Sequence, residues 1–227
     1  MSPSFDPQQC PVLSIDDHLP AVPAHRLVAS ALREQFERAP PWQPERLSDR
    51  PLPARSPVHA SVLMPLVVRD GGTTVLLTQR ASHLSDHPGQ ISFPGGRAEP
   101  DDSSAIATAL RDAEEEVGLA RDFVQVLGTL PHYTTITGYV VTPVVALVQP
   151  GFQLRVDASE VAEVFEVPLA YLMTPAHHRH HAITADPARE FLSIPWTAPV
   201  TDGMAKNYFI WGATAAMLRN FYRFVSA

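Results

Sequence analysis

Four carboxylates occupy five consecutive positions of this chain, at Asp112 and Glu114–Glu116, and the run ends at Gly118. Like charges spaced three or four residues apart on a helix repel one another and destabilise it. Such a run is stable when the carboxylates face water or when a cation lies among them. The choice between a solvated acidic face and a cation site therefore decides what the chain can do.

The acidic run belongs to a helix predicted over residues 104–117. Ser103 or Ser104 can cap its N-terminus, and Gly118 is placed to end it in a left-handed conformation. At about 100° per residue, the apolar side chains of this helix form one narrow stripe, made by Ile106, Leu110, Ala113 and Val117. We expect that stripe to be the buried side.

Three of the four carboxylates are expected to converge away from the stripe. Asp112, Glu115 and Glu116 share an arc of about 100° on the side away from the core, and Glu114 projects from the opposite flank. Just upstream, residues 94–96 read Pro-Gly-Gly, which lets the backbone approach another group without a Cβ in the way. Hard divalent cations such as Mg²⁺ bind carboxylates, backbone carbonyls, water and substrate phosphates. This combination favours a cation site.

The composition excludes several classes of function. A formal net charge of −7 and a pI of about 5.8 argue against a surface for nucleic acid or anionic lipid. Cys10 is the only cysteine, so no intrachain disulfide is possible. The longest apolar runs fall short of the roughly 18 residues that span a bilayer, and no signal sequence is apparent. We expect a cytoplasmic protein with no nucleic-acid and no membrane partner.

The prolines divide the chain in two. Eleven of the 23 fall within residues 1–57, which limits regular structure there. We assign residues 1–57 to an N-terminal extension with one amphipathic helix at 24–39, and residues 58–227 to a single domain. In that domain we predict strands at 60–68, 73–80, 123–130, 139–148 and 189–195, and helices at 104–117, 169–173 and 210–225. Because these elements mix without strict βαβ alternation, an α/β fold with a mixed sheet covered by helices is expected.

A family resemblance appears in the stretch GGRAEPDDSSAIATALRDAEEEVGL, residues 95–119. It resembles the signature of the Nudix hydrolases, which reads G, five residues, E, seven residues, R-E-U-x-E-E-x-G-U. The second half matches at Arg111, Asp112, Ala113, Glu115, Glu116, Gly118 and Leu119, with Asp112 in place of a glutamate. The first half carries one extra loop residue, which leaves the role of Asp102 open.

The resemblance implies an α/β/α Nudix sandwich that uses Mg²⁺ or Mn²⁺. It implies that Glu115 and Glu116 ligate the cation, that Asp112 assists directly or through water, and that Arg111 orients these carboxylates. A carbonyl of Gly95 is a further candidate ligand.

A second resemblance concerns the substrate. Residues 76–96 are similar to the additional motif of the coenzyme A pyrophosphatase branch, at Leu76, Leu77, Thr78, Arg80, Leu84, His87, Gly89, Gln90 and Phe93–Gly96. The likeness extends over most of residues 58–223. One departure is that Ser85 and Asp86 stand where members often carry a basic residue. The resemblance implies hydrolysis of the diphosphate of coenzyme A, or of its thioesters, to 3′,5′-ADP and 4′-phosphopantetheine.

Several residues are candidates for binding the substrate. A diphosphate is anionic and kinetically inert, so its hydrolysis needs cations and an activated water. Arg80 can clamp a phosphate, with a surface ion pair as the alternative. His87 can contact substrate or serve as a structural hydrogen-bonding group. Gly95 and Gly96 allow the substrate to approach the backbone closely.

The general base and a histidine run are less determined. Glu160 and Glu163 can each reach the attacking water from a loop or short helix, or can be exposed acids beside a strand; we name Glu163 as the catalytic candidate. Residues 177–181 read HHRHH and are expected to form an exposed loop without a metal. Two rival functions stay open, a Nudix pyrophosphatase for other nucleoside diphosphate derivatives and a Nudix-fold binding module. A homodimer is also left open.

Overall fold

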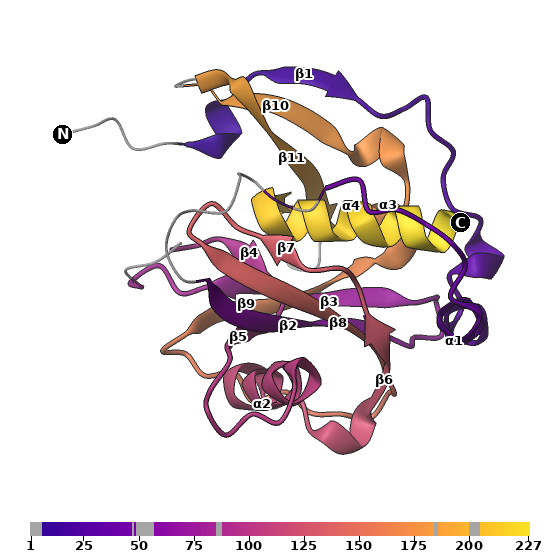
Figure 1. Cartoon of the computed structure of the whole chain (residues 1–227), viewed down its shortest axis with the longest axis vertical. Helices are drawn as coiled ribbons and strands as arrows, with labels where there is room; N and C mark the ends of the chain where they lie inside the picture. Colours follow the sequence, from indigo (N-terminus) through magenta and orange to yellow (C-terminus); the bar gives the residue numbers. More distant parts are fainter. Residues whose placement is uncertain (1–5, 47, 49–56, 85–87, 184–185, 200–204) are drawn as a thin grey trace.

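Two β-sheets enclose one helix in this protein, and a second helix covers the larger sheet from outside (Figure 1). The computed structural model describes residues 6–46, 48, 57–84, 88–183, 186–199 and 205–227, without the side chains of residues 186–188. Helix α4 (Gly212–Ser226) lies between the sheets, and α2 (Ala105–Val117) covers the opposite face of the larger sheet. The predicted helix–sheet–helix sandwich is confirmed, and a second sheet adds a fourth layer.

The larger sheet is mixed. Its strands are β2 (Val58–Val67), β3 (Thr74–Arg80), β4 (Ile91–Ser92), β5 (Gly95–Arg97), β6 (Val124–Thr129), β7 (Tyr133–Thr134), β8 (Tyr139–Val148) and β9 (Val161–Pro168). The main path runs β4-β3-β2-β8-β6, while β5, β7 and β9 pair with β2, β8 and β3 respectively. β2 and β8 pair in parallel over their whole length, and the other pairs are antiparallel. The predicted hairpin of β2 and β3 is confirmed.

The smaller sheet contains a segment that we expected to be an exposed loop. Its strands run in the order β1 (Val12–Ile15), β10 (Arg179–Ile183), β11 (Asp186–Ala198) and β12 (Lys206–Trp211), all antiparallel. The prediction for residues 177–181 is wrong, because β10 covers most of them and His178 and His181 are buried. Both rings have hydrogen-bond partners inside the fold. His178 Nε2 lies 2.8 Å from the Leu172 carbonyl oxygen, and the two nitrogens of His181 lie 2.8 Å from Ser193 Oγ and 3.1 Å from the carbonyl oxygen of Cys10, which is distant in sequence.

The N-terminal extension packs against both sheets. The single helix predicted at 24–39 is two elements, a 3₁₀ turn η2 (Ala24–Arg26) and helix α1 (Ala29–Arg38). Leu32 is buried on the inner side of α1, whereas Val28 is the N-cap residue of α1 and is 45% exposed. β1 adds this extension to the smaller sheet. The division at residue 57 stays a prediction.

The remaining elements are short. They are η1 (Pro7–Gln9), η3 (Arg121–Phe123), α3 (Leu169–Leu172) and η4 (Pro175–His177). Helix α3 and the final helix α4 confirm the predictions for those regions. Within the described part of the chain, no helix has the length and apolar character needed to cross a membrane.

Candidate active-site cleft

The acidic helix α2 begins and ends at two local signals. Ser104, and not Ser103, caps it, because Ser104 Oγ accepts a hydrogen bond of 3.2 Å from the Ala107 N–H. Gly118 ends the helix in a left-handed conformation, with a φ of 70°. Ala113 and Val117 are buried in a cluster against the larger sheet, as the apolar stripe predicts. The helix is therefore held in one rotation about its axis.

That rotation gives different degrees of exposure to the three carboxylates that we expected to face outward together. Glu116 is only 8% exposed and does not lie on a face away from the core. Asp112 is also largely covered, whereas Glu115 is 63% exposed at its side chain and pairs with Arg111. Glu114 projects elsewhere and pairs with Arg121, as expected for the opposite flank. The expectation of one shared, outward arc is wrong, because β5 covers the Asp112 and Glu116 side of the helix.

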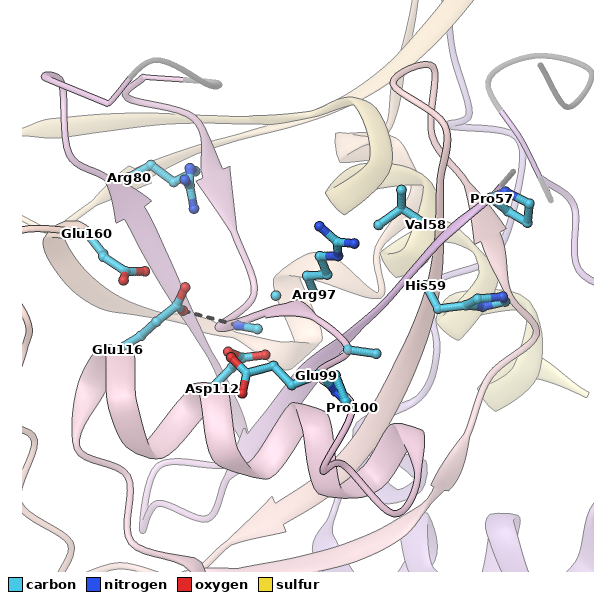
Figure 2. A pocket seen from close by; sticks show the side chains of 13 residues that line it. Pro57, Val58, His59, Arg80, Arg97, Glu99, Pro100, Asp112, Glu116 and Glu160 are labelled. Carbon is cyan, nitrogen blue, oxygen red and sulfur yellow. Dashed lines mark hydrogen bonds between the residues drawn. The ribbon is translucent and has the colours of Figure 1, made fainter. Parts of the chain in front are cut away.

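The two glycines of β5 allow this close contact. The Gly95 N–H donates a hydrogen bond of 3.1 Å to Glu116 Oε2 (Figure 2). Gly95 has a φ of +147°, and a Cβ there would lie 2.4 Å from the Ser61 carbonyl oxygen. A Cβ on Gly96 would lie 3.3 Å from both carboxylate oxygens of Asp112. Only glycine fits at Gly95, and any larger residue at Gly96 crowds the Asp112 carboxylate.

These groups open onto a cleft of about 1030 Å³. It is bounded by α2, by β5, by the start of β2 and by the end of β3. Its polar side chains are His59, Arg80, Arg97, Glu99, Asp112, Glu116 and Glu160. In Figure 2, Arg80 and Glu160 lie on the same side of the cleft as Glu116, and Arg97 extends away from α2.

Burial makes both α2 carboxylates of the cleft unusually basic. Burial, helped by the nearby charges of Glu160 and Asp112 and opposed by the hydrogen bond from the Gly95 N–H, raises the pKa of Glu116 to about 7. Burial likewise raises the pKa of Asp112 to about 6, although Arg111 opposes the change. Two carboxyl groups with raised pKa values in one cleft mark a candidate functional site where a bound cation would stabilise the ionised forms.

The donor set fits a divalent cation. Asp112 Oδ2 is buried and has no hydrogen-bond partner, which leaves one acceptor oxygen for a ligand. Among the described residues, no three His, Cys, Asp or Glu side chains converge as a complete metal site. Mg²⁺ is typically bound by one or two carboxylates together with water and substrate phosphates, and not by a closed protein cage. Asp112 and Glu116 supply that number of carboxylates.

Arg111 organises one side of the cleft. Its Nε and Nη2 donate to the two carboxylate oxygens of Asp102 at 3.1 and 2.9 Å, and its Nη1 donates to Asp112 at 2.9 Å and to Glu115 at 3.0 Å. This contact holds the pKa of Asp102 well below its usual range. Asp102 also accepts a hydrogen bond from Thr108 Oγ1 at 2.9 Å. The role left open for Asp102 is therefore to fix Arg111 and the first turn of α2.

Some of the predicted residues lie outside the cleft lining. Glu163 lies within β9, not on a loop or short helix, where its carboxylate accepts from Tyr208 Oη at 2.8 Å and pairs with Lys206. Glu115 is bound to Arg111 and does not line the cleft. The catalytic and ligand roles of these two residues stay predictions. His87 lies outside the described residues, whereas Arg80 lines the cleft.

Arg97 is a cleft residue that sequence reasoning missed. Side chains alternate along a strand, so Arg97 points to the side opposite that of Gly96, away from α2 and into the open space in Figure 2. The available signal was its position directly after Gly95 and Gly96, which have no side chain to fill the cleft. The cleft thus carries two arginines, Arg80 and Arg97, together with its carboxylates.

A comparison with known families decides the assignment. The family model of the NUDIX domain matches residues 57–187, which include β5, α2 and the whole cleft wall. The chain belongs to the Nudix family. Nudix hydrolases act on small molecules, generally with divalent ions such as Mg²⁺ or Mn²⁺, and the family supports hydrolysis of nucleoside diphosphate derivatives.

Two relatives resemble this Nudix chain over most of their lengths. The uncharacterized Nudix hydrolase NudL of Photorhabdus laumondii is 39% identical over 186 residues, covering 82% of this chain and 90% of the relative. The protein of the same name from Escherichia coli is 43% identical over 165 residues, covering 71% and 79%. Among solved structures, a Nudix hydrolase from M. smegmatis, RenU, is 26% identical, covers 49% of this chain and 71% of its own, and has a TM-score of 0.42.

Proposed function

We propose that this chain hydrolyses the diphosphate linkage of coenzyme A, or of a coenzyme A thioester, to 3′,5′-ADP and 4′-phosphopantetheine with Mg²⁺ or Mn²⁺. The observation that carries the reaction class is the buried carboxylate of Glu116 beside the partly buried carboxylate of Asp112, in a cleft that also holds Arg80 and Arg97. The choice of coenzyme A rests on the resemblance of residues 76–96 to the motif of that branch.

The carboxylates and one backbone carbonyl of the cleft would bind the cation. Asp112, Glu116 and the Gly95 carbonyl would hold the cation, with Glu115 as a further ligand. When bound, the cation neutralises charge on the diphosphate and lowers the pKa of the attacking water. Arg111 keeps Asp112 in place through the 2.9 Å contact.

The arginines of the cleft bind and orient the diphosphate. Arg80 and Arg97 line the open space beyond the two carboxylates, and a guanidinium can contact two phosphate oxygens at once. Because these groups are fixed on β3 and β5, they hold the diphosphate in one orientation.

A carboxylate oxygen of Glu160 would accept the proton of the attacking water. Glu160 lines the cleft, and its charge reaches Glu116 strongly enough to raise the pKa of that residue. Glu163 stays the alternative, but its carboxylate is engaged by Lys206 and Tyr208. A general base must lie within hydrogen-bond reach of the proton it takes, directly or through one water.

The test identifies the products. The purified chain is incubated with coenzyme A and Mg²⁺ in water labelled with oxygen-18, and the products are weighed by mass spectrometry. We expect 3′,5′-ADP and 4′-phosphopantetheine, one of them with a single heavy oxygen. Absence of both products, with turnover of ADP-ribose or a nucleoside triphosphate under the same conditions, would assign the chain to another Nudix substrate.

A binding module without turnover is the second rival. The aspartate at position 112 and the displacement of Glu115 from the cleft favour it. Metal-dependent turnover that is lost in Glu116→Gln contradicts this rival. A wild-type chain without turnover that binds coenzyme A as well as the variant does would support it.

A further inference from the structure

A second cavity, of about 670 Å³, lies beside the cleft. Five parts of the chain line it: η1, the segment before β4, the turn between β7 and β8, the facing ends of β10 and β11, and the junction of β12 with α4. Nothing in the reaction described above uses this space, which we call the side pocket.

The side pocket and the cleft share two walls. On one wall, the Gly89 N–H donates to the Arg80 carbonyl oxygen at 3.2 Å, and the Arg80 N–H donates to the Gln90 carbonyl oxygen at 3.0 Å. Arg80 lines the cleft, and Gly89 and Gln90 line the side pocket. Backbones paired in this way lie about 5 Å apart, so one segment that lines the cleft is the direct neighbour of one that lines the side pocket.

The second shared wall lies at the turn between β7 and β8. Ile136 of this turn lines the side pocket and is 45% exposed. Two residues later, the Gly138 carbonyl oxygen accepts from the Val58 N–H at 3.3 Å, and Val58 lines the cleft. A molecule held at Arg80 and Arg97 therefore has the side pocket within reach of one end.

The charges of the side pocket disfavour a phosphate. Its ionisable side chains are Asp6, Arg189 and Glu190, which together carry no excess of positive charge. A 3′-phosphate would add about two negative charges beside two carboxylates, so the 3′-phosphoadenosine end of coenzyme A does not suit this pocket.

The side pocket does suit an uncharged chain that contains amides. Ile136, Ile183 and Trp211 supply apolar and aromatic surface, and Gln90 supplies an amide. Helix α4 begins at Gly212, and the first N–H groups of a helix lack partners within it. They are donors placed for the carbonyl groups of a pantetheine arm.

Parts of the pocket come from outside the matched NUDIX segment. Residues 6–8, 189–191 and 211–212 contribute the η1, β11 and α4 sides, whereas the family model ends at residue 187. The shared Nudix domain alone therefore lacks these walls, as expected for a feature that adapts a common reaction to one substrate.

We propose that the side pocket binds the pantetheine arm and the acyl chain of a coenzyme A thioester while its diphosphate lies in the cleft. This inference rests on the proposed function. It makes an acylated coenzyme A, and not free coenzyme A, the better substrate.

The test compares substrates and an exposed side chain of the pocket. kcat/KM is measured for coenzyme A and for S-octanoyl coenzyme A with Mg²⁺, using wild type, Ile136→Ser and Val156→Ser. Val156 is a matched control, since it is also an exposed apolar residue, 38% accessible, in a loop outside both cavities. We expect the wild type to favour the octanoyl substrate at least about tenfold, Ile136→Ser to bring the ratio toward one, and Val156→Ser to leave both rates unchanged.

Two outcomes overturn the inference. They are a wild-type ratio near one, and a ratio that Ile136→Ser leaves unchanged. If neither substrate is hydrolysed, the proposed function fails. Calorimetric titration with S-octanoyl pantetheine, which has no phosphate, then tests separately whether the side pocket binds an acylated pantetheine arm. Binding that weakens in Ile136→Ser and persists in Val156→Ser supports the pocket, and no binding to wild type excludes it.

Discussion

Three of the four carboxylates of α2 are glutamates, yet the residues around them give each different contacts. Glu116 meets the Gly95 N–H and is buried, and Glu114, two positions earlier, pairs with Arg121 at the surface. A carboxylate with a raised pKa in a cleft is a candidate for function, whereas a surface ion pair contributes about 1 kcal/mol or less. This contrast within one helix provides a matched pair of variants.

Glu116→Gln is expected to lower kcat/KM by at least about a hundredfold with the fold intact, because it removes a charged oxygen donor. Glu114→Gln makes the same chemical change on the same helix and is expected to leave the rate within about twofold. Steady-state assays with Mg²⁺ and circular dichroism on both variants check this prediction. Equal losses in the two variants would show that the effect comes from the helix and not from the cleft.

A second pair of variants tests which glutamate is the general base. Glu160→Gln is expected to lower kcat about a hundredfold, since this carboxylate lines the cleft. Glu163→Gln breaks contacts with Lys206 and Tyr208 and is expected to have a smaller effect on kcat. The reverse order of effects, measured as kcat across pH, would return the role of base to Glu163.

The raised pKa of Glu116 also makes stability depend on pH. The folded chain keeps this proton up to a pH of about 7, whereas the ordinary value is 4.5, so the folded state binds more protons between these values. Without metal, the free energy of unfolding therefore falls as pH rises from about 4.5 to about 7, by on the order of 3 kcal/mol.

Chemical denaturation in the presence of a chelator, at intervals across this range, measures that fall. Glu116→Gln should remove the part of this fall that is due to Glu116 and leave the part due to Asp112, whose pKa is raised from 3.8 to about 6. Added Mg²⁺ should stabilise the wild type more at pH 8 than at pH 5. A wild-type curve already flat without metal would contradict the assigned pKa of Glu116.

Among the elements, β5 is the one whose sequence tolerates least change. It pairs antiparallel with β2, and the absence of a side chain at Gly95 lets it pass over Ser61. Gly95→Ala is expected to destabilise the fold by at least about 3 kcal/mol, because a positive φ and a Cβ overlap with backbone combine.

Gly72→Ala is the control for the φ effect alone. Gly72 has a φ of +113°, but a Cβ there would have no neighbour within 4 Å. We expect this variant to lose about 1 kcal/mol. Urea unfolding of both variants separates the two contributions, and similar losses would show that the contact with Ser61 relaxes.

Elements whose sequence pattern is sufficient to define them were predicted, whereas elements that depend on pairing with distant segments were not. β8 coincides with the apolar run predicted at 139–148, because a strand buried on both faces reads as continuous hydrophobic sequence. β5 has three residues, two of them glycine, and exists only through pairing with β2. β10 was missed because the buried ring of His181 is hydrogen-bonded to Cys10 and Ser193, which lie on other parts of the chain and are not part of a local pattern.

The candidate site was predictable to a similar extent. The acidic run at Asp112, Glu115 and Glu116 and the glycines before it predicted from local sequence the wall of the cleft that carries Asp112 and Glu116. The exposure of Glu115 depends on Arg111, which in turn depends on Asp102 across the loop. The contacts of Glu163 depend on β12, more than forty residues away. Helical geometry alone could not give these partners.

In the whole molecule, a buried ion cluster connects the N-terminal extension to α4. The Arg219 side chain is only 3% exposed and contacts Asp16 at 3.1 Å and Glu45 at 2.8 Å. Its Nη1 also lies 3.1 Å from His178 Nδ1, and burial lowers the pKa of His178 to about 4, so this ring is neutral at neutral pH. The cluster joins three parts of the chain that are distant in sequence.

Arg219→Met is expected to destabilise the fold by about 3 kcal/mol, because Asp16 is left buried without its countercharge. Arg38→Met removes an exposed ion pair with Glu34 and should change stability by less than about 0.5 kcal/mol. Thermal and urea unfolding of both variants measure the difference. A small effect of Arg219→Met would mean that His180, which also contacts Asp16, is sufficient to stabilise that carboxylate.

The position of α4 between the two sheets has a consequence for biosynthesis. Eleven of its residues are buried, and it follows every strand in the chain. During translation, the strands therefore leave the ribosome before the helix that separates the two sheets, and the inner faces of both sheets stay uncovered until α4 emerges. Nascent chains at that stage expose apolar surface that favours aggregation. A chain whose synthesis stops before α4 should therefore depend on chaperones to stay in solution.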